Sequence, residues 1–179
     1  MDRALPAAPA LPVSESERTS VVGLERWGAH YARIAIATAF LSSVAARFGL
    51  WGAQSSWKSF SDFTRYTAQV NSFMPAAIIP VLAWAATVAE LSLGIALIVG
   101  VGLRLAAIGS SLLLALFGTA MAVSFGIKAP LDYSVFSASA GALLLALHET
   151  RRARGSSRLA RSHSHPLVPR STHEGTSQL

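Results

Sequence analysis

Two long stretches of this chain are almost free of ionisable side chains, and they constrain its fold more than any other feature. Leu105–Ile127 contains no Lys, Arg, Asp or Glu, and Tyr66–Leu103 contains Glu90 alone. A helix needs about 20 mostly apolar residues to cross a bilayer core about 30 Å thick. Both stretches meet that requirement. Charged residues are 13% of the whole chain, against about 25% in soluble domains. The sequence therefore predicts a membrane protein.

These stretches and their surroundings predict an all-α integral membrane fold, a four-transmembrane-helix bundle. The expected spans cover residues of about 27–48, 76–101, 103–125 and 132–148. Together they form a membrane domain over 27–148, between a disordered head (1–26) and a disordered basic tail (149–179). The tail is rich in Arg, Ser and His and has no apolar periodicity, so it cannot bury an apolar face.

The connection between the first two spans has a helical pattern of its own. Aromatic and apolar residues recur there every three or four positions, with polar residues between them: Trp57, Phe60, Phe63, Tyr66, Val70 and Phe73. This spacing is typical of an amphipathic helix. We expect an interfacial helix that lies across the outer mouth of the bundle, aromatic side down. The alternative interpretation is an aromatic belt that extends the second span.

The distribution of basic residues predicts the orientation in a bacterial plasma membrane. Four spans place both termini on one side, with eleven Arg residues there and four Lys or Arg residues on the other side. Because cytoplasmic segments carry the excess of Lys and Arg, both termini are predicted to be cytoplasmic. The basic tail would then contact anionic headgroups of the lipid bilayer. No base-reading or stacking module is present, so we expect no nucleic-acid partner.

Glu90 is the candidate intramembrane functional residue, because it lies near the centre of the second span. A carboxylate at that depth is costly unless it faces the bundle interior and has a partner. Its helical neighbours Ala83, Ala86, Thr87 and Gly94 are small, which predicts contact with other helices. Two interpretations stay open. Glu90 is either a hydrogen-bonded structural acid or a group that handles a proton or a ligand.

Arg47 is the second candidate, near the outer end of the first span. It continues a spacing-four row of small residues, Ala35, Ala39 and Ser43, which predicts that it points inward. Aligning the spans by their ends puts its α-carbon about 12 Å from that of Glu90 along the membrane normal. A contact with Glu90 would then need a bridging ligand or water. The alternative is that Arg47 extends to the outer headgroups.

Other chemistries have little support in the sequence. With no cysteine, the chain cannot form a disulfide or a thiolate metal site. His30 and His148 fall at the predicted cytoplasmic edge, and a haem held by both would need the two rings in one cavity. The tail histidines are too sparse for a metal tract. We therefore expect no metal site and no cofactor bound by this chain alone.

A run of small and apolar residues around Glu90 continues into the third span. It reads Ala89-Glu90-Leu91-Ser92-Leu93-Gly94-Ile95-Ala96-Leu97-Ile98-Val99-Gly100, followed by Leu103-Arg104-Leu105-Ala106-Ala107. In order, spacing and span count, the chain resembles the DoxX family over roughly residues 29–147. The resemblance implies that Glu90 is a buried polar anchor, that Gly94 and Gly100 are structural positions and that Arg104 is a turn residue at the inner face.

The same resemblance implies an accessory or quinone-linked subunit of a membrane redox system. Its partner would be a membrane oxidoreductase and its candidate cofactor a quinone, while the chain alone would not be an enzyme. Self-association into a homo-oligomer is left open. Two other classes remain as alternatives: a small-solute or lipid transporter that uses Glu90 within the bundle, and a non-catalytic membrane anchor.

Overall fold

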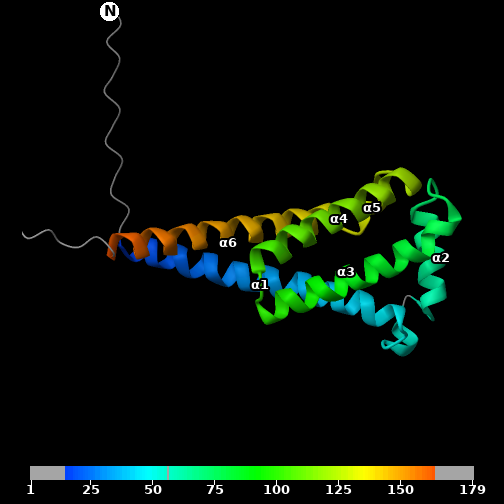
Figure 1. The fold of residues 1–179 in the computed structure, drawn as a ribbon, viewed down its shortest axis with the longest axis horizontal. Coiled ribbons are helices and arrows are strands. Elements are labelled where there is room, and N and C mark those ends of the chain that lie inside the picture. Colours follow the sequence, from blue (N-terminus) through cyan, green and yellow to red (C-terminus); the bar gives the residue numbers. More distant parts are fainter. Residues whose placement is uncertain (1–14, 56, 164–179) are drawn as a thin grey trace, which may run out of the picture.

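The computed structural model describes residues 15–55 and 57–163, and all regular structure in those ranges is helical (Figure 1). The long helices are α1 (Glu15–Arg47), α3 (Ile79–Val99), α4 (Leu103–Phe125) and α6 (Val135–His163). The short elements are α2 (Phe60–Val70), α5 (Lys128–Asp132) and two 3-10 turns, Gly52–Gln54 and Ala76–Ile78. Gly100 and Gly102, both with positive φ, make the tight turn between α3 and α4.

Two of these helices are long and apolar enough to cross a membrane. They are Ala76–Val99, which includes the 3-10 turn before α3, and Leu103–Phe125, with 24 and 23 residues. Their bounds agree closely with the predicted second and third spans. The all-helical fold is thus confirmed for the described residues, with two helices that could cross a membrane, and the crossing of the membrane by α1 and α6 stays a prediction.

Buried and exposed residues are distributed as expected for a protein whose solvent is lipid. Large apolar side chains on α3 and α4 face outward: Val81, Trp84, Val88, Leu112, Leu116 and Val123 are all more than half exposed. The interior instead contains small and polar residues, among them Ala37, Ala83, Thr87, Ala107, Ser110 and Ser139. In lipid, helices are held together by close approach and by hydrogen bonds rather than by burial of large apolar groups.

Close approach is clearest between α1 and α3 and between α4 and α6, the two pairs with the most extensive contact. A Cβ on Gly94 would lie 3.0 Å from Leu41 on α1. A Cβ on Gly118 of α4 would lie 2.7 Å from the ring of Phe136 on α6. The hydroxyl of Ser139 also donates to the carbonyl oxygen of Ser111 at 2.8 Å.

The predicted inward row on α1 is only partly correct. Ala35 and Ala39 are exposed, whereas Arg47 is buried. The buried face of this helix instead runs through Ala37, Phe40, Val44 and Arg47. Because an α-helix has 3.6 residues per turn, a spacing-four row drifts by about 40° at each step. Three steps carry the row from the lipid side to the interior.

The two ends of the membrane domain differ from the predicted boundaries. α1 begins at Glu15, inside the head predicted to be disordered, and α6 runs on to His163, inside the predicted tail. An existing helix is extended at one hydrogen bond per residue without a new nucleation cost, so the charged segments continue the helices beside them. Figure 1 shows these extensions of α1 and α6 side by side, beyond the turn that joins α3 and α4. Residues 1–14 and 164–179 lie outside the described residues.

α2 is a separate helix that crosses the end of the bundle, as Figure 1 shows. Ser59 caps it by accepting a hydrogen bond from the backbone N–H of Asp62 at 3.3 Å. Its inner side buries Phe63, Thr67 and Val70. The amphipathic pattern therefore forms its own helix rather than an extension of the second span. Whether it lies at a membrane interface stays a prediction.

Candidate functional site: a buried ion pair between α1 and α3

Arg47 and Glu90 form an ion pair in the interior of the bundle. The guanidinium Nη2 of Arg47 donates to Oε1 of Glu90 at 2.5 Å, and each residue is only 2% exposed. The arginine is the last residue of α1 and the glutamate lies in the middle of α3. In a low-dielectric interior such a pair is strongly coupled, and removing either partner leaves an uncompensated charge.

The predicted separation in depth between these two residues was wrong, and the reason is a shift of α1 along α3. Arg33 of α1 reaches the carbonyl oxygen of Ile98, at the C-terminal end of α3, at 3.1 Å. Fourteen residues later, Arg47 has reached only Glu90 and Thr87. The two helices are antiparallel, and α1 ends beside the turn of α3 that contains Thr87 and Glu90. The end of α1 is therefore not level with the start of α3, as an alignment of the span ends assumes.

α2 and the loop before it cover the part of α3 that α1 leaves free. Phe60 of α2 packs on Trp84 of α3 with ring centroids 4.4 Å apart, and Phe48 stacks on Phe60 at 5.8 Å. The ring of Phe63 lies under the guanidinium of Arg47, with Cζ 3.8 Å from the ring centroid. A cation over an aromatic face is stabilised, most strongly when water is excluded. The predicted interfacial helix thus closes the ion pair on its outer side.

Hydroxyl groups complete the polar cluster. Nη1 of Arg47 donates to Oγ1 of Thr87 at 2.8 Å, and that hydroxyl donates in turn to the carbonyl oxygen of Ala83 at 2.8 Å. Nη2 of Arg47 also approaches Oγ of Ser43, at 3.3 Å. Thr87 lies one turn before Glu90 on α3, so the two present a matched pair of acceptors to the planar guanidinium.

Two atoms of the pair remain without a hydrogen-bond partner among the described residues. They are Nε of Arg47 and Oε2 of Glu90, both buried. Buried polar atoms of this kind are uncommon and often indicate a water or a functional role. The cluster therefore retains one unused donor and one unused acceptor inside the bundle.

The other predicted site residues have distinct positions. Gly94 lies where α3 comes closest to α1, one turn from Glu90. Gly100 ends α3 with φ +87, and a Cβ there would lie 3.6 Å from Nη1 of Arg33. Arg104 is exposed in the first turn of α4, away from the ion pair. The structure brings together Arg47, Glu90 and Gly94 and leaves Arg104 apart.

Sequence reasoning missed the roles of Phe63 and Arg33 in this region. Phe63 was expected on the apolar side of an amphipathic helix, and it does lie there, but its contact with a buried cation depends on where α2 docks. Nη2 of Arg33 donates to the carbonyl oxygen of Ile98 and so caps the C-terminal end of α3, a contact that no pattern in the sequence indicates.

The histidines do not form a common site in the described structure. Nδ1 of His30 lies 2.7 Å from the carbonyl oxygen of Arg26 on the exposed surface of α1. His148 lines a pocket between α1 and α6, and His30 is not among the residues that line it. Within 15–55 and 57–163, no three His, Cys, Asp or Glu residues come together as metal ligands.

Comparison with known protein families identifies a related family. The model of a family described as methylamine utilisation protein MauE matches residues 25–132, well over half of the chain. No curated protein and no solved structure matches the chain.

This match overturns the predicted membership of the DoxX family. The quoted run from Ala89 to Ala107 consists of small and apolar residues around one acid, which close packing of membrane helices favours in many families. Such a run therefore discriminates poorly between families. The quinone and the structural roles that the resemblance implied lose their basis with it.

Proposed function

The chain belongs to the MauE family, and on that premise we propose that it is a membrane accessory protein of a redox system that serves methylamine utilisation. The family description supplies the physiological setting. The structure supports an accessory role, because the two interior charges pair directly and are closed off from solvent: Nη2 of Arg47 donates to Oε1 of Glu90, and each residue is only 2% exposed. This closed pair is the observation that carries the proposal.

A closed ion pair sets the position of one helix against another. Here it holds the end of α1 beside Thr87 and Glu90 of α3 and provides a cation on which α2 docks through Phe63. We propose that this rigid arrangement presents the helix surfaces to a membrane oxidoreductase, which carries the redox centre. Because the chain contains no cysteine, any thiol exchange in this redox system would have to be carried out by the partner.

Copurification tests the accessory role. The full chain, tagged and extracted in mild detergent from cells growing on methylamine, is expected to retain a redox protein in a fixed ratio. Visible absorbance should follow that partner and be absent from the chain purified alone. A stoichiometric chromophore on the isolated chain would contradict the proposal, as would the absence of any redox protein under conditions that preserve the folded bundle.

The proposed topology has four spans in a bacterial plasma membrane, with α1 and α6 as the first and last and both termini cytoplasmic. The alternating directions of α1, α3, α4 and α6 support it, as does the excess of basic residues on one side. A reporter at the C-terminus should read cytoplasmic, and one inserted near Ser61, in the exposed first turn of α2, should read external. Reporters that read the same side would contradict the four-span topology.

A second candidate function, transport of a proton or small solute, has one specific observation in its favour. Oε2 of Glu90 is buried and without a hydrogen-bond partner among the described residues, so it offers an acceptor inside the bundle. Uptake by vesicles that contain the purified chain alone would favour transport. Under the accessory proposal such vesicles are inactive.

A further inference from the structure

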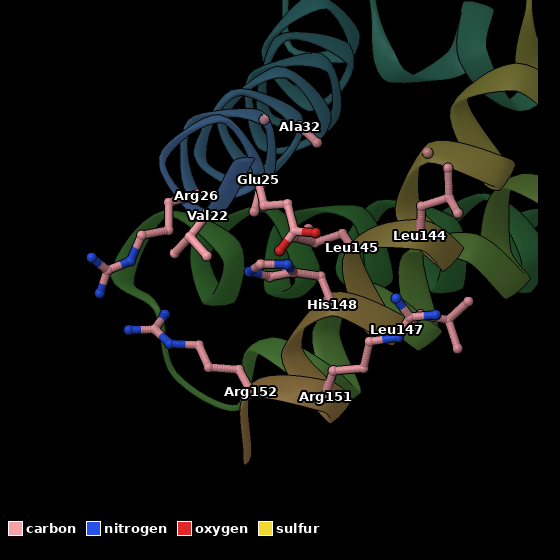
Figure 2. A pocket seen from close by; sticks show the side chains of 13 residues that line it. Val22, Glu25, Arg26, Ala32, Leu144, Leu145, Leu147, His148, Arg151 and Arg152 are labelled. Carbon is pink, nitrogen blue, oxygen red and sulfur yellow. The ribbon is translucent and has the colours of Figure 1, made fainter. Parts of the chain in front are cut away.

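The structure contains a pocket, away from the ion pair, between the N-terminal half of α1 and the middle of α6 (Figure 2). Its volume is about 760 Å³, within the range of small-molecule sites. It begins beside the bundle core, where Leu145 is buried, and runs toward the projecting ends of both helices. We propose that this pocket binds one anionic phospholipid of the surrounding membrane.

The sequence builds the pocket from one face of each helix. On α1 the lining residues fall at helical spacing: Val22, Glu25, Arg26, Gly28, Ala29 and Ala32. On α6 they do the same: Gly141, Leu144, Leu145, Leu147, His148, Arg151 and Arg152. The gap exists because the facing residues are small. A Cβ on Gly28 or Gly141 would meet nothing within 4 Å, so neither helix fills the space between them.

The two ends of the pocket differ in chemistry. Toward the bundle it is apolar, with Ala32, Gly141 and Leu145 in its walls. Toward the projecting ends it is basic, with Arg26, Arg151 and Arg152. Figure 2 shows the guanidinium groups of Arg26 and Arg152 on one side and that of Arg151 on the other, with Glu25 and His148 between the helices. Three arginines against one carboxylate leave a net positive charge.

This polarity matches a lipid rather than a soluble anion. In the proposed topology the apolar part lies at the depth of the inner leaflet and the arginines at its headgroups. Arg26 is seven residues, about 10 Å, beyond Arg33, which marks the end of α3. Basic pockets between transmembrane helices on the cytoplasmic side are a known setting for anionic headgroups. The phosphate would lie beside the guanidinium groups of Arg26 and Arg152, and an acyl chain along Leu144 and Leu145.

The inference is independent of the redox partner proposed above. Lipid retention can fail while copurification succeeds, and copurification can fail while lipid retention succeeds. The test uses the full chain in neutral detergent, relipidated with phosphatidylglycerol or with phosphatidylcholine of the same acyl chains. We expect about one phosphatidylglycerol retained per chain and a higher Tm with that lipid. Phosphatidylcholine should be retained at least tenfold less. Equal retention of both lipids would overturn the proposal.

Variants distinguish a specific site from general charge attraction. Arg26→Gln with Arg152→Gln should weaken phosphatidylglycerol binding at least tenfold. Arg104→Gln is the matched control, because it removes an exposed arginine from the same predicted side without touching the pocket. Gly141→Leu should also abolish retention by filling the apolar end, while the protein stays folded because its Cβ has room. An equal effect of Arg104→Gln, or no effect of Gly141→Leu, would contradict the proposal.

A last experiment distinguishes binding of a whole phospholipid from binding of a free phosphate ion. Inorganic phosphate at millimolar concentration should neither raise Tm nor displace the retained phosphatidylglycerol. If phosphate alone stabilised the protein as much as the lipid does, the site would belong to a soluble anion and the proposal would be wrong.

Discussion

Replacing Glu90 by Leu is expected to lower the free energy of unfolding by about 3–5 kcal/mol, because it leaves the guanidinium of Arg47 buried without its anion. Arg47→Met should cost about as much, since it strands the carboxylate. The double variant Arg47→Met/Glu90→Leu should recover most of this loss, because two apolar side chains replace two charges. Equilibrium unfolding of all four proteins in one mild detergent measures the cycle.

The exposed pair Lys128–Asp132 is the matched control for this cycle. Its atoms are 2.5 Å apart, as in the buried pair, but the Lys128 side chain is 83% exposed. The variant Lys128→Met/Asp132→Leu and its single variants should change stability by less than about 1 kcal/mol. If the single variants at Arg47 and Glu90 changed stability as little as those at Lys128 and Asp132, the buried ion pair would not stabilise the fold as we infer.

The double variant also distinguishes a structural role of the ion pair from a role of Glu90 in binding or proton transfer. If the ion pair only sets the position of α1, the stable double variant keeps its partner and its function. A folded, stable double variant that lost function while retaining the partner would instead assign Glu90 a role in binding or proton transfer.

Gly94→Leu is expected to be the other severe substitution. A Cβ at this position would lie 3.0 Å from Leu41 and 3.4 Å from the backbone carbonyl oxygen of Ala37, and a full leucine would push α1 away from α3. Overpacking alone costs about 1–3 kcal/mol. The displacement would also stretch the ion pair one turn away, so the total loss should exceed that range.

Gly23→Leu controls for the intrinsic effect of replacing a helical glycine. An added Cβ at Gly23 meets nothing within 4 Å, so this variant should be neutral or slightly stabilising. Thermal unfolding in the same detergent compares the two. Equal stability of Gly94→Leu and Gly23→Leu would show that α1 and α3 are not in tight contact at Gly94.

Sequence patterns predicted the parts of this fold that depend on local composition. The charge-free stretch Leu105–Ile127 predicted the helix α4, and the spacing of aromatic residues predicted the separate helix α2. They did not predict the contact between Arg47 and Glu90. That contact depends on the offset of α1 along α3, which is set by packing between helices, at Gly94 in particular, and leaves no periodic signal in either helix.

The same limit applies to the pocket between α1 and α6. The tail arginines gave a correct expectation of basic character, but the lack of apolar periodicity suggested disorder there. The helix continues because each segment extends one already formed, and Arg and Ala favour helix. Only with both helices in place do Arg26 and Arg151, 125 positions apart in sequence, border one space.

The unbroken course of α1 gives the molecule a mechanical property. Its 33 residues make a rod about 50 Å long, and helices without a kink bend only gently. One end projects past the turn between α3 and α4, while the other is fixed to Glu90 beneath α2. Arg33 at Ile98 and Arg47 at Glu90 hold this rod to α3 at two separate levels, so the direction of its projecting end is set by α3.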